Sequence, residues 1–282
     1  VGQVLKGLKI VIDGAHTDSG PKAAELSRRL GAEVVLLNGD VLPLSGQHKA
    51  DPSKDENLKE LREKILALKA DFGLAFDLDG DRCAVVFAKK DRSLESLPPD
   101  ILIAVILPFL MKNGGYDLKR IQEAGKKGVA VVRDVLGTEA VDKVAKSFGA
   151  EAHQTDAGYV FLKARVRQLK DQGFVVPTYG ESSGHGWLHV TGPIENPLAL
   201  AALMAVMVKE YKENKPSVEY VCEEIVKESL VVPYKRSGRF DPAFHDKFLK
   251  KLSDLLSDEE RRQMNGWTSE NKKAIPQVVI SK

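Results

Sequence analysis

The sequence predicts an α/β protein with two consecutive three-layer domains, each built on a mixed, mostly parallel sheet, and a partial C-terminal segment. Three observations support this. Short β-rich apolar runs alternate with stretches of helical periodicity, and the alternation occurs twice. The length of 282 residues is also nearly twice that of a usual domain. Helices that connect strands favour parallel sheets, so ligand-binding loops are expected after the carboxyl ends of strands.

The first alternation is assigned to residues 1–97. Its first strand ends in a turn-rich loop, and Pro21 then opens a helix at the position that proline prefers. The expected strands are residues 8–12, 33–37, 72–76 and 84–88, and the expected helices are the one opened by Pro21 and residues 57–68. Residues 84–88 follow the third strand closely enough to form a hairpin with it, and the charged residues 89–96 are expected to be a connector.

The second alternation is assigned to residues 98–215. The expected helices are residues 100–111, 138–148, 159–169 and 198–211, and the expected strands are residues 129–132, 151–154 and 174–179. The last helix is expected to close this domain. Residues 216–282 are rich in charge and too short to be assigned as a complete third domain.

Composition excludes several classes of protein. The 42 basic and 40 acidic residues leave a net charge of +2, which provides no broad basic field for nucleic acid. The longest apolar stretch, residues 101–111, is far shorter than a membrane span. Cys83 and Cys222 lie far apart and fit a reducing compartment better than a disulfide scaffold or zinc site. We expect a cytoplasmic protein without a nucleic-acid or membrane partner, and residues 1–9 show no signal peptide. The chain begins with Val1 in place of Met and enters a strand by Leu8, so it is expected to be cut from a longer chain.

An acidic segment, residues 77–82, directly follows the expected strand 72–76 and reads Asp-Leu-Asp-Gly-Asp-Arg. Alternating carboxylates on a tight glycine-containing turn can converge three oxygens on one hard cation, and Mg²⁺ prefers such oxygen ligands. The three carboxylates carry more negative charge than one Mg²⁺ neutralises, so we expect the site to have an additional electrophilic role toward a phosphoryl group. The candidate metal ligands are Asp77, Asp79 and Asp81.

Three other interpretations of the acidic segment involve different chemistry. It can be a polar turn in which aspartates cap backbone groups. An EF-hand is excluded, because its loop needs Gly at the sixth position and Glu at the twelfth, where Arg82 and Ala88 stand. A phosphatase of the haloacid dehalogenase type would use the first aspartate as a nucleophile, but that family expects Thr or Val in place of Asp81.

A second polar segment, residues 180–186, reads Gly-Glu-Ser-Ser-Gly-His-Gly and also follows an expected strand. Glycines such as Gly180 and Gly184 let the backbone approach a ligand closely, while Glu181 and Ser183 can bind sugar hydroxyls. His185 can exchange protons near neutral pH, although a lone histidine is as often a structural hydrogen-bonding group.

The frame Gly-x-Ser-x-Gly around Ser182 also matches a hydrolase motif. A triad would have to use His189 or His245, the candidate histidines that follow, and this interpretation leaves the acidic segment unexplained.

Together the two segments resemble those of the α-D-phosphohexomutase family, which includes phosphoglucomutases, phosphomannomutases and phosphoglucosamine mutases. Its metal loop D-x-D-x-D-R is similar to residues 77–82 and its sugar loop G-E-x-S-G-H to residues 180–185, in the same order and at about the same separation. The resemblance implies Mg²⁺ on the three aspartates, Arg82 near the transferring phosphoryl group, and Glu181 and Ser183 on the sugar, with His185 as a proton carrier.

The resemblance further implies an isomerase that interconverts hexose 1- and 6-phosphates through a phosphoserine and a bisphosphate intermediate. Residues 1–97 would be domain II, residues 98–215 domain III, and residues 216–282 a linker and the start of domain IV. No T-A-S-H-N-P-like phosphoserine loop occurs, and Arg236-Ser237-Gly238 does not continue as the family's phosphate clamp. The segment is therefore expected to be inactive without the family's N- and C-terminal domains.

Other departures concern the substrate. Leu136 stands where many members carry Lys, and Tyr159 where some carry His. The alternative from another class is a non-catalytic module that binds a sugar phosphate or a protein and keeps the fold.

Overall fold

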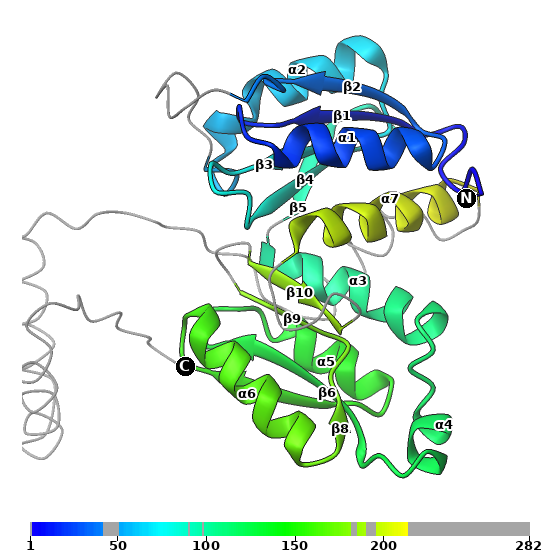
Figure 1. The fold of residues 1–282 in the computed structure, drawn as a ribbon, viewed down its shortest axis with the longest axis vertical. Coiled ribbons are helices and arrows are strands. Elements are labelled where there is room, and N and C mark those ends of the chain that lie inside the picture. The colour runs from blue at the N-terminus through cyan, green and yellow to red at the C-terminus, as the bar shows by residue number, and fades with distance from the viewer. Residues whose placement is uncertain are drawn as a thin grey trace, which may run out of the picture. The chain divides into compact units, whose positions relative to one another are not determined.

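The computed structural model describes residues 2–41, 51–89, 91–97, 99–181, 185–189 and 196–213. All of them belong to one compact unit, and Figure 1 shows that they form two sheets with helices on their faces. The first sheet contains β1 (Lys9–Asp13), β2 (Glu33–Leu37), β3 (Phe72–Phe76), β4 (Cys83–Ala88) and β5 (Leu94–Leu97), in the order β2-β1-β3-β4-β5. β1 pairs parallel with β2 and β3, whereas β4 pairs antiparallel with β3 and β5.

Side-chain alternation along the first sheet explains its three layers. Ile10 and Ile12 are buried on the face covered by α1 (Ser19–Arg29). Val11 points the opposite way and packs with η1 (Asp55–Leu58) and α2 (Lys59–Leu68). Successive residues of a strand face opposite sides, so this short apolar run supplies both faces.

The second sheet has the order β10-β9-β6-β7, and β8 also pairs with β6. Its strands are β6 (Gly128–Asp134), β7 (Glu151–Thr155), β8 (Phe174–Val175), β9 (Thr178–Gly180) and β10 (Gly186–Leu188). β6 pairs parallel with β7, β8 and β9, and β10 is antiparallel to β9. Its helices are α3 (Pro99–Asn113), α4 (Leu118–Glu123), α5 (Ala140–Ser147), α6 (Tyr159–Asp171) and α7 (Pro197–Glu213). Both sheets are therefore mixed α/β layers, as the sequence predicts.

The faces of the second sheet are buried by different helices. Ala130 and Val132 of β6 pack in a cluster with α6, whereas Val129 and Val131 belong to the cluster that contains α3 and α5. The cluster that contains Val129 and Val131 also contains Ile10 and Ile12 of the first sheet. One continuous apolar core therefore connects the two sheets.

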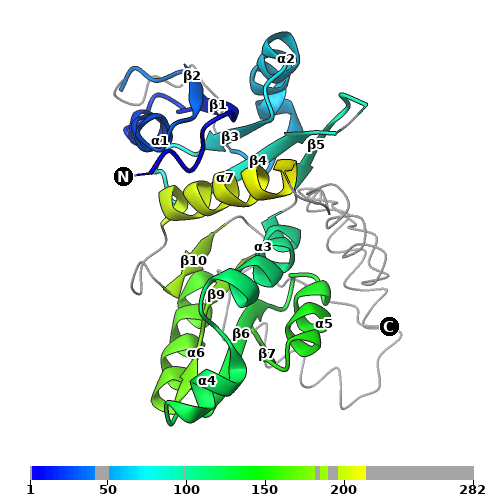
Figure 2. The same cartoon turned by 90° about the vertical axis from the view of Figure 1, so that its right-hand side faces the viewer.

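Helix α7 lies within this shared core. We expected it to close the second half of the chain, but it contacts α1 and β4 of the first sheet as well as β10 and α3. Figures 1 and 2 show it between the two sheets in both views. At its end the Lys212 ammonium lies 2.8 Å from the Asp71 carboxylate and donates to the Gly7 carbonyl at 3.0 Å. The helix thus joins both sheets rather than covering one.

Several elements differ from the sequence prediction. The expected strand 174–179 is divided into β8 and β9, because Pro177 lacks the amide hydrogen that a continuous ladder needs. The expected connector 89–96 overlaps β5, an edge strand that begins at Leu94 and ends at the buried Leu97. The helices α4 and η1 and the strand β10 were not predicted.

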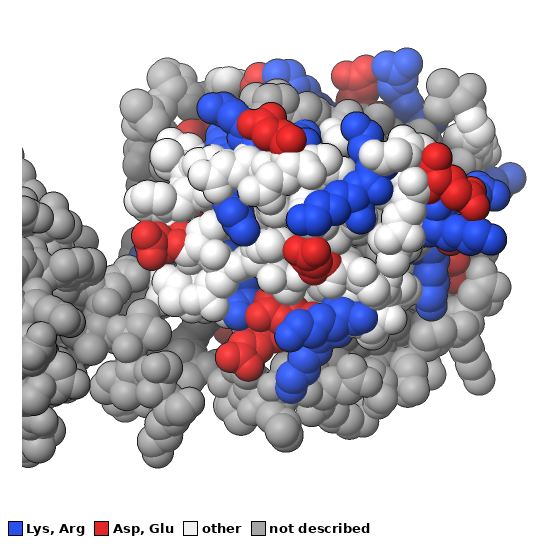
Figure 3. Space-filling model, turned by 90° about the horizontal axis from the view of Figure 1, so that it is seen from below, with Lys and Arg blue, Asp and Glu red and all other residues white. Residues whose placement is uncertain are grey.

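Charged side chains of both signs are interspersed with uncharged ones on the face shown in Figure 3. Among the described residues, no helix is both long and apolar enough to cross a membrane.

Candidate active site

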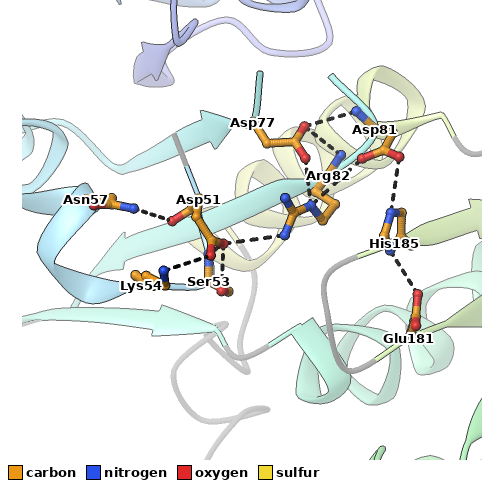
Figure 4. Close-up of polar contacts among 9 residues, drawn as sticks. All are labelled: Asp51, Ser53, Lys54, Asn57, Asp77, Asp81, Arg82, Glu181 and His185. Atoms are coloured by element: carbon orange, nitrogen blue, oxygen red, sulfur yellow. Dashed lines mark hydrogen bonds and ion pairs between the residues drawn. The ribbon is translucent and has the colours of Figure 1, made fainter. Parts of the chain in front are cut away.

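The two polar segments that the sequence singles out meet in the structure. Residues 77–82 connect β3 to β4, and residues 181–185 connect β9 to β10. The backbones of Arg82 and His185 form an isolated antiparallel bridge, and the His185 Nε2 lies 3.1 Å from the Asp81 Oδ2. Figure 4 shows the imidazole between the side chains of Asp81 and Glu181. Residues 104 positions apart in the chain therefore share one site.

The acidic loop is closed by its first aspartate. Asp77 is 1% exposed, and its Oδ1 accepts hydrogen bonds from the backbone N–H groups of Asp81 and Arg82 at 3.0 and 3.1 Å. Gly80 has a φ of +71°, and a Cβ there would lie 2.2 Å from the Ser19 Oγ at the start of α1. Glycine is thus required both by the turn and by its close approach to α1.

The carboxylates of the acidic loop fit a hard divalent cation. Asp77, Asp79 and Asp81 each offer an oxygen, and these oxygens lie within 4.8 Å of one another. The Asp81 Oδ1 is buried and accepts no hydrogen bond from the described residues, and the Arg82 Nε is 3.8 Å away. A buried carboxylate oxygen without a donor is costly, and a cation would satisfy it.

Arg82 is held by carboxylates on two sides. Its Nε donates to the Asp77 Oδ2 at 2.6 Å, and its Nη1 lies 3.4 Å from the Asp51 Oδ1. Partial burial lowers the pKa of Arg82, but the hydrogen bond with Asp77 and the charges of Asp77, Asp51 and Asp81 raise it above its usual value. The guanidinium is therefore a fixed positive charge beside the loop.

His185 links the two loops through both ring nitrogens. Its Nδ1 lies 2.8 Å from the Glu181 Oε2, and the Glu181 backbone N–H donates to the His185 carbonyl at 2.9 Å. The hydrogen bond with Glu181 is the largest cause of a raised pKa, which burial opposes and the charge of Asp81 reinforces. The imidazole thus holds its proton more firmly than an exposed histidine does.

The sequence-predicted sugar loop is described in part. Glu181 is 9% exposed and lies beside His185, whereas Ser183 and Gly184 lie outside the described residues. Gly180 has a packing reason of its own, because a Cβ there would lie 2.0 Å from the Ile103 Cγ1 of α3.

The sequence analysis did not single out Asp51. Asp51-Pro52-Ser53 indicates an Asx turn, in which the carboxylate accepts from the backbone N–H two residues on, but this pattern does not encode the contact with Arg82. Leu136 and Tyr159, the two positions where the sequence departs from the family's pattern, are 42% and 44% exposed. The Tyr159 ring lies 5.7 Å from that of His185, between centroids, so this side chain borders the candidate site.

Comparison with known proteins agrees with both halves of the fold. The family described as phosphoglucomutase/phosphomannomutase, alpha/beta/alpha domain II matches residues 3–90, and its domain III matches residues 98–228. A phosphomannomutase/phosphoglucomutase from Pseudomonas syringae is 31% identical over 182 residues, which are 64% of this chain and 35% of the relative. A phosphoglucosamine mutase from Campylobacter hominis is 26% identical over 94% of this chain and 52% of its own length.

Solved structures show the same fold. A family protein from Burkholderia thailandensis superposes with a TM-score of 0.62 at 24% identity, over 79% of this chain and 45% of that one. Parafusin, a phosphoglucomutase from Paramecium, superposes with a TM-score of 0.59 at 23% identity, over 80% of this chain and 39% of parafusin. The chain spans about a third to a half of the length of these relatives. With two successive family models matched in order, the chain belongs to the phosphoglucomutase/phosphomannomutase family of α-D-phosphohexomutases and carries its middle domains.

Proposed function

We propose that this chain carries the metal loop and the sugar loop of a Mg²⁺-dependent phosphohexomutase, with residues 1–97 as domain II, 98–215 as domain III and 216–282 as the lead into domain IV. The observation that carries the proposal is the contact of His185 with Asp81 and Glu181 at 3.1 and 2.8 Å, because it joins a carboxylate cluster to a polar loop of the other sheet. A phosphoryl group and the sugar that bears it need such neighbouring subsites.

The acidic loop would hold Mg²⁺ through Asp77, Asp79 and Asp81, and bound Mg²⁺ would supply charge neutralisation for the transferring phosphoryl group. Arg82 presents a fixed cation on the same side of the loop, which stabilises negative charge on phosphoryl oxygens.

The second loop would bind the sugar. Glu181 and Ser183 would accept and donate hydrogen bonds with sugar hydroxyls, Gly180 and Gly184 would allow the backbone to approach, and His185 would carry a proton near them. The relatives are named for phosphates of glucose, mannose and glucosamine, which supports a hexose phosphate as the proposed substrate.

Calorimetry of Mg²⁺ binding tests the metal assignment. Asp79→Ala removes an exposed ligand, so binding should weaken at least about tenfold while the fold persists. Asp91→Ala is the control, because Asp91 is an exposed aspartate of the same sheet, in the turn between β4 and β5. Equal Mg²⁺ affinity in the wild type and Asp79→Ala would refute the assignment.

Turnover by the 282 residues alone is expected to be absent, because the sequence holds no T-A-S-H-N-P-like phosphoserine loop. The assay supplies hexose 1-phosphate, Mg²⁺ and a glucose 1,6-bisphosphate primer and monitors the 6-phosphate. Measurable turnover that Arg82→Lys abolishes would show that this chain contains its own phosphoryl donor.

A further inference from the structure

Arg82 has a second carboxylate partner that lies outside both polar loops. Asp51 is 31 positions earlier in the chain, and its Oδ1 lies 3.4 Å from the Arg82 Nη1, whereas Asp77 takes the Nε at 2.6 Å. We infer that Asp51 is a positioning residue that orients the Arg82 guanidinium for phosphoryl binding. The inference deepens the proposed function and depends on it for the identity of the ligand.

Asp51 is suited to this role because its own carboxylate is fixed. Its Oδ1 accepts hydrogen bonds from the Ser53 backbone N–H at 3.1 Å and from the Ser53 Oγ at 2.7 Å. Its carbonyl accepts from the Asn57 Nδ2 at 2.9 Å, and the Lys54 ammonium lies 3.5 Å from its Oδ2 (Figure 4). Ser53 and Lys54 hold the carboxylate and Asn57 holds the backbone, so the side chain loses little further entropy when it contacts an arginine.

The segment that bears Asp51 is anchored to the first sheet. Arg62 of α2 donates through its Nη2 to the Asp55 Oδ1 at 3.0 Å and to the Ser96 Oγ of β5 at 2.7 Å. Asp51 lies four residues before Asp55, so these hydrogen bonds restrain its position relative to the first sheet. Arg82 directly precedes β4 of the same sheet, so both members of the contact are positioned by that sheet.

Two anchors on separate elements define the plane of a guanidinium, because the group is rigid and its donors diverge in a fixed fork. Asp77 alone would fix the Nε and leave the outer nitrogens less constrained. With Asp51 on the Nη1, the Nη2 is the nitrogen that donates to none of the described residues. A phosphoryl oxygen would accept a hydrogen bond from this nitrogen.

The chain contains a matched control for Asp51. Asp91 forms the same Asp-x-Ser turn, in which its Oδ1 accepts from the Ser93 N–H at 2.8 Å and the Ser93 Oγ at 2.6 Å. Asp91 is exposed and has no arginine contact among the described residues. Asp91→Ala therefore removes the turn alone, whereas Asp51→Ala removes the turn and the second partner of Arg82.

The experiment compares wild type, Asp51→Asn, Asp51→Ala and Asp91→Ala in two measurements. The first is the Nε–Hε resonance of Arg82 in ¹⁵N NMR, assigned by its loss in Arg82→Lys. The second is the affinity for glucose 1,6-bisphosphate with Mg²⁺, measured by calorimetry. Asp51→Asn keeps an acceptor for Ser53 but removes the charge, so it separates electrostatic positioning from the local turn.

Both Asp51 variants should shift and broaden the Arg82 resonance and weaken bisphosphate binding by about three- to tenfold. Asp91→Ala should change neither. In an Arg82→Lys background, Asp51→Asn should cause no further loss of affinity, because the group that it orients is gone.

An unchanged Arg82 resonance in Asp51→Asn, or a full additional loss of affinity in the Arg82→Lys background, would overturn the inference. Failure of the proposed function gives a different result: the wild type would not bind the bisphosphate, and the NMR measurement would still decide whether Asp51 orients Arg82.

Discussion

Replacing Gly180 with alanine tests the packing of β9 against α3, on which the second polar loop rests. The ideal Cβ of residue 180 would lie 2.0 Å from the Cγ1 of Ile103 and 2.7 Å from its Cδ1. Ile103 is 2% exposed, and a β-branched side chain on a helix has one strongly preferred rotamer. The isoleucine therefore cannot swing aside, and either β9 or α3 must shift.

The magnitude follows from two opposing effects. Overpacking a core by one methyl group costs about 1–3 kcal/mol. Alanine in a strand gains about 0.5–1 kcal/mol over glycine through chain entropy. The free energy of unfolding should thus fall by about 1–2 kcal/mol, which lowers the Tm by about 2–8 °C in a protein of this size.

Thermal unfolding of Gly180→Ala beside Gly128→Ala provides the measurement. Gly128 lies in β6 of the same sheet, and a Cβ there would meet side chains only at 3.6 Å or more, so this control should be neutral or slightly stabilising. In an Ile103→Ala background, which removes the obstructing atoms, the Gly180→Ala penalty should largely vanish.

Equal Tm values for the two glycine variants would refute the packing explanation. If Gly180 is glycine only so that a ligand can approach its backbone, the alanine variant would keep the wild-type Tm and lose bisphosphate affinity instead. The two explanations of this residue therefore predict opposite results for the Tm of the alanine variant.

Three further predictions concern the second sheet and the buried thiol. Asp142→Ala removes the bidentate partner of Arg133, whose side chain is 6% exposed. The free energy of unfolding, measured by calorimetry, should therefore fall by about 3 kcal/mol. Burial and the charge of Arg165 lower the pKa of His153, so the unfolded chain binds more protons just below about pH 6.5. The contribution of His153 to stability should therefore fall as the pH drops through that window, and Arg165→Gln should raise the pKa of His153 in an NMR titration. Burial raises the pKa of the Cys83 thiol, so peptide mapping should show it alkylated only after unfolding.

The strands and helices were predictable where burial follows a simple period. Ile10, Val11 and Ile12 are apolar because both faces of β1 are covered, and the sequence shows this as a continuous run. The edge strand β5 was missed because its neighbours are charged, and its pairing with β4 depends on tertiary context rather than on composition. Pro177 interrupts what looked like one strand, although proline's missing donor was visible in the sequence.

The residues of the two candidate loops could be predicted from the sequence, but the contact between the two loops could not. The acidic turn and the polar glycine-rich loop each follow a strand, so local pattern and strand-end position were sufficient to find them. Their meeting at His185 and Asp81 depends on how the two sheets pack, which no local pattern encodes. Asp51 was missed for the same reason, because its contact with Arg82 joins a loop to a distant strand end.

Apolar packing far from the charges therefore decides whether the charges meet. Helix α7 follows the second loop in sequence, yet it packs on α1 and β4 of the first sheet and on β10 of the second. Met204, Ala205 and Met207 of this helix are fully buried in the core shared by both sheets. Because β4 starts directly after Arg82 and β10 starts directly after His185, the helix that packs on both strands fixes how far apart the two loops are held. The short distance between His185 and Asp81 is thus a consequence of the hydrophobic packing between the two sheets rather than of the attraction between these two side chains alone.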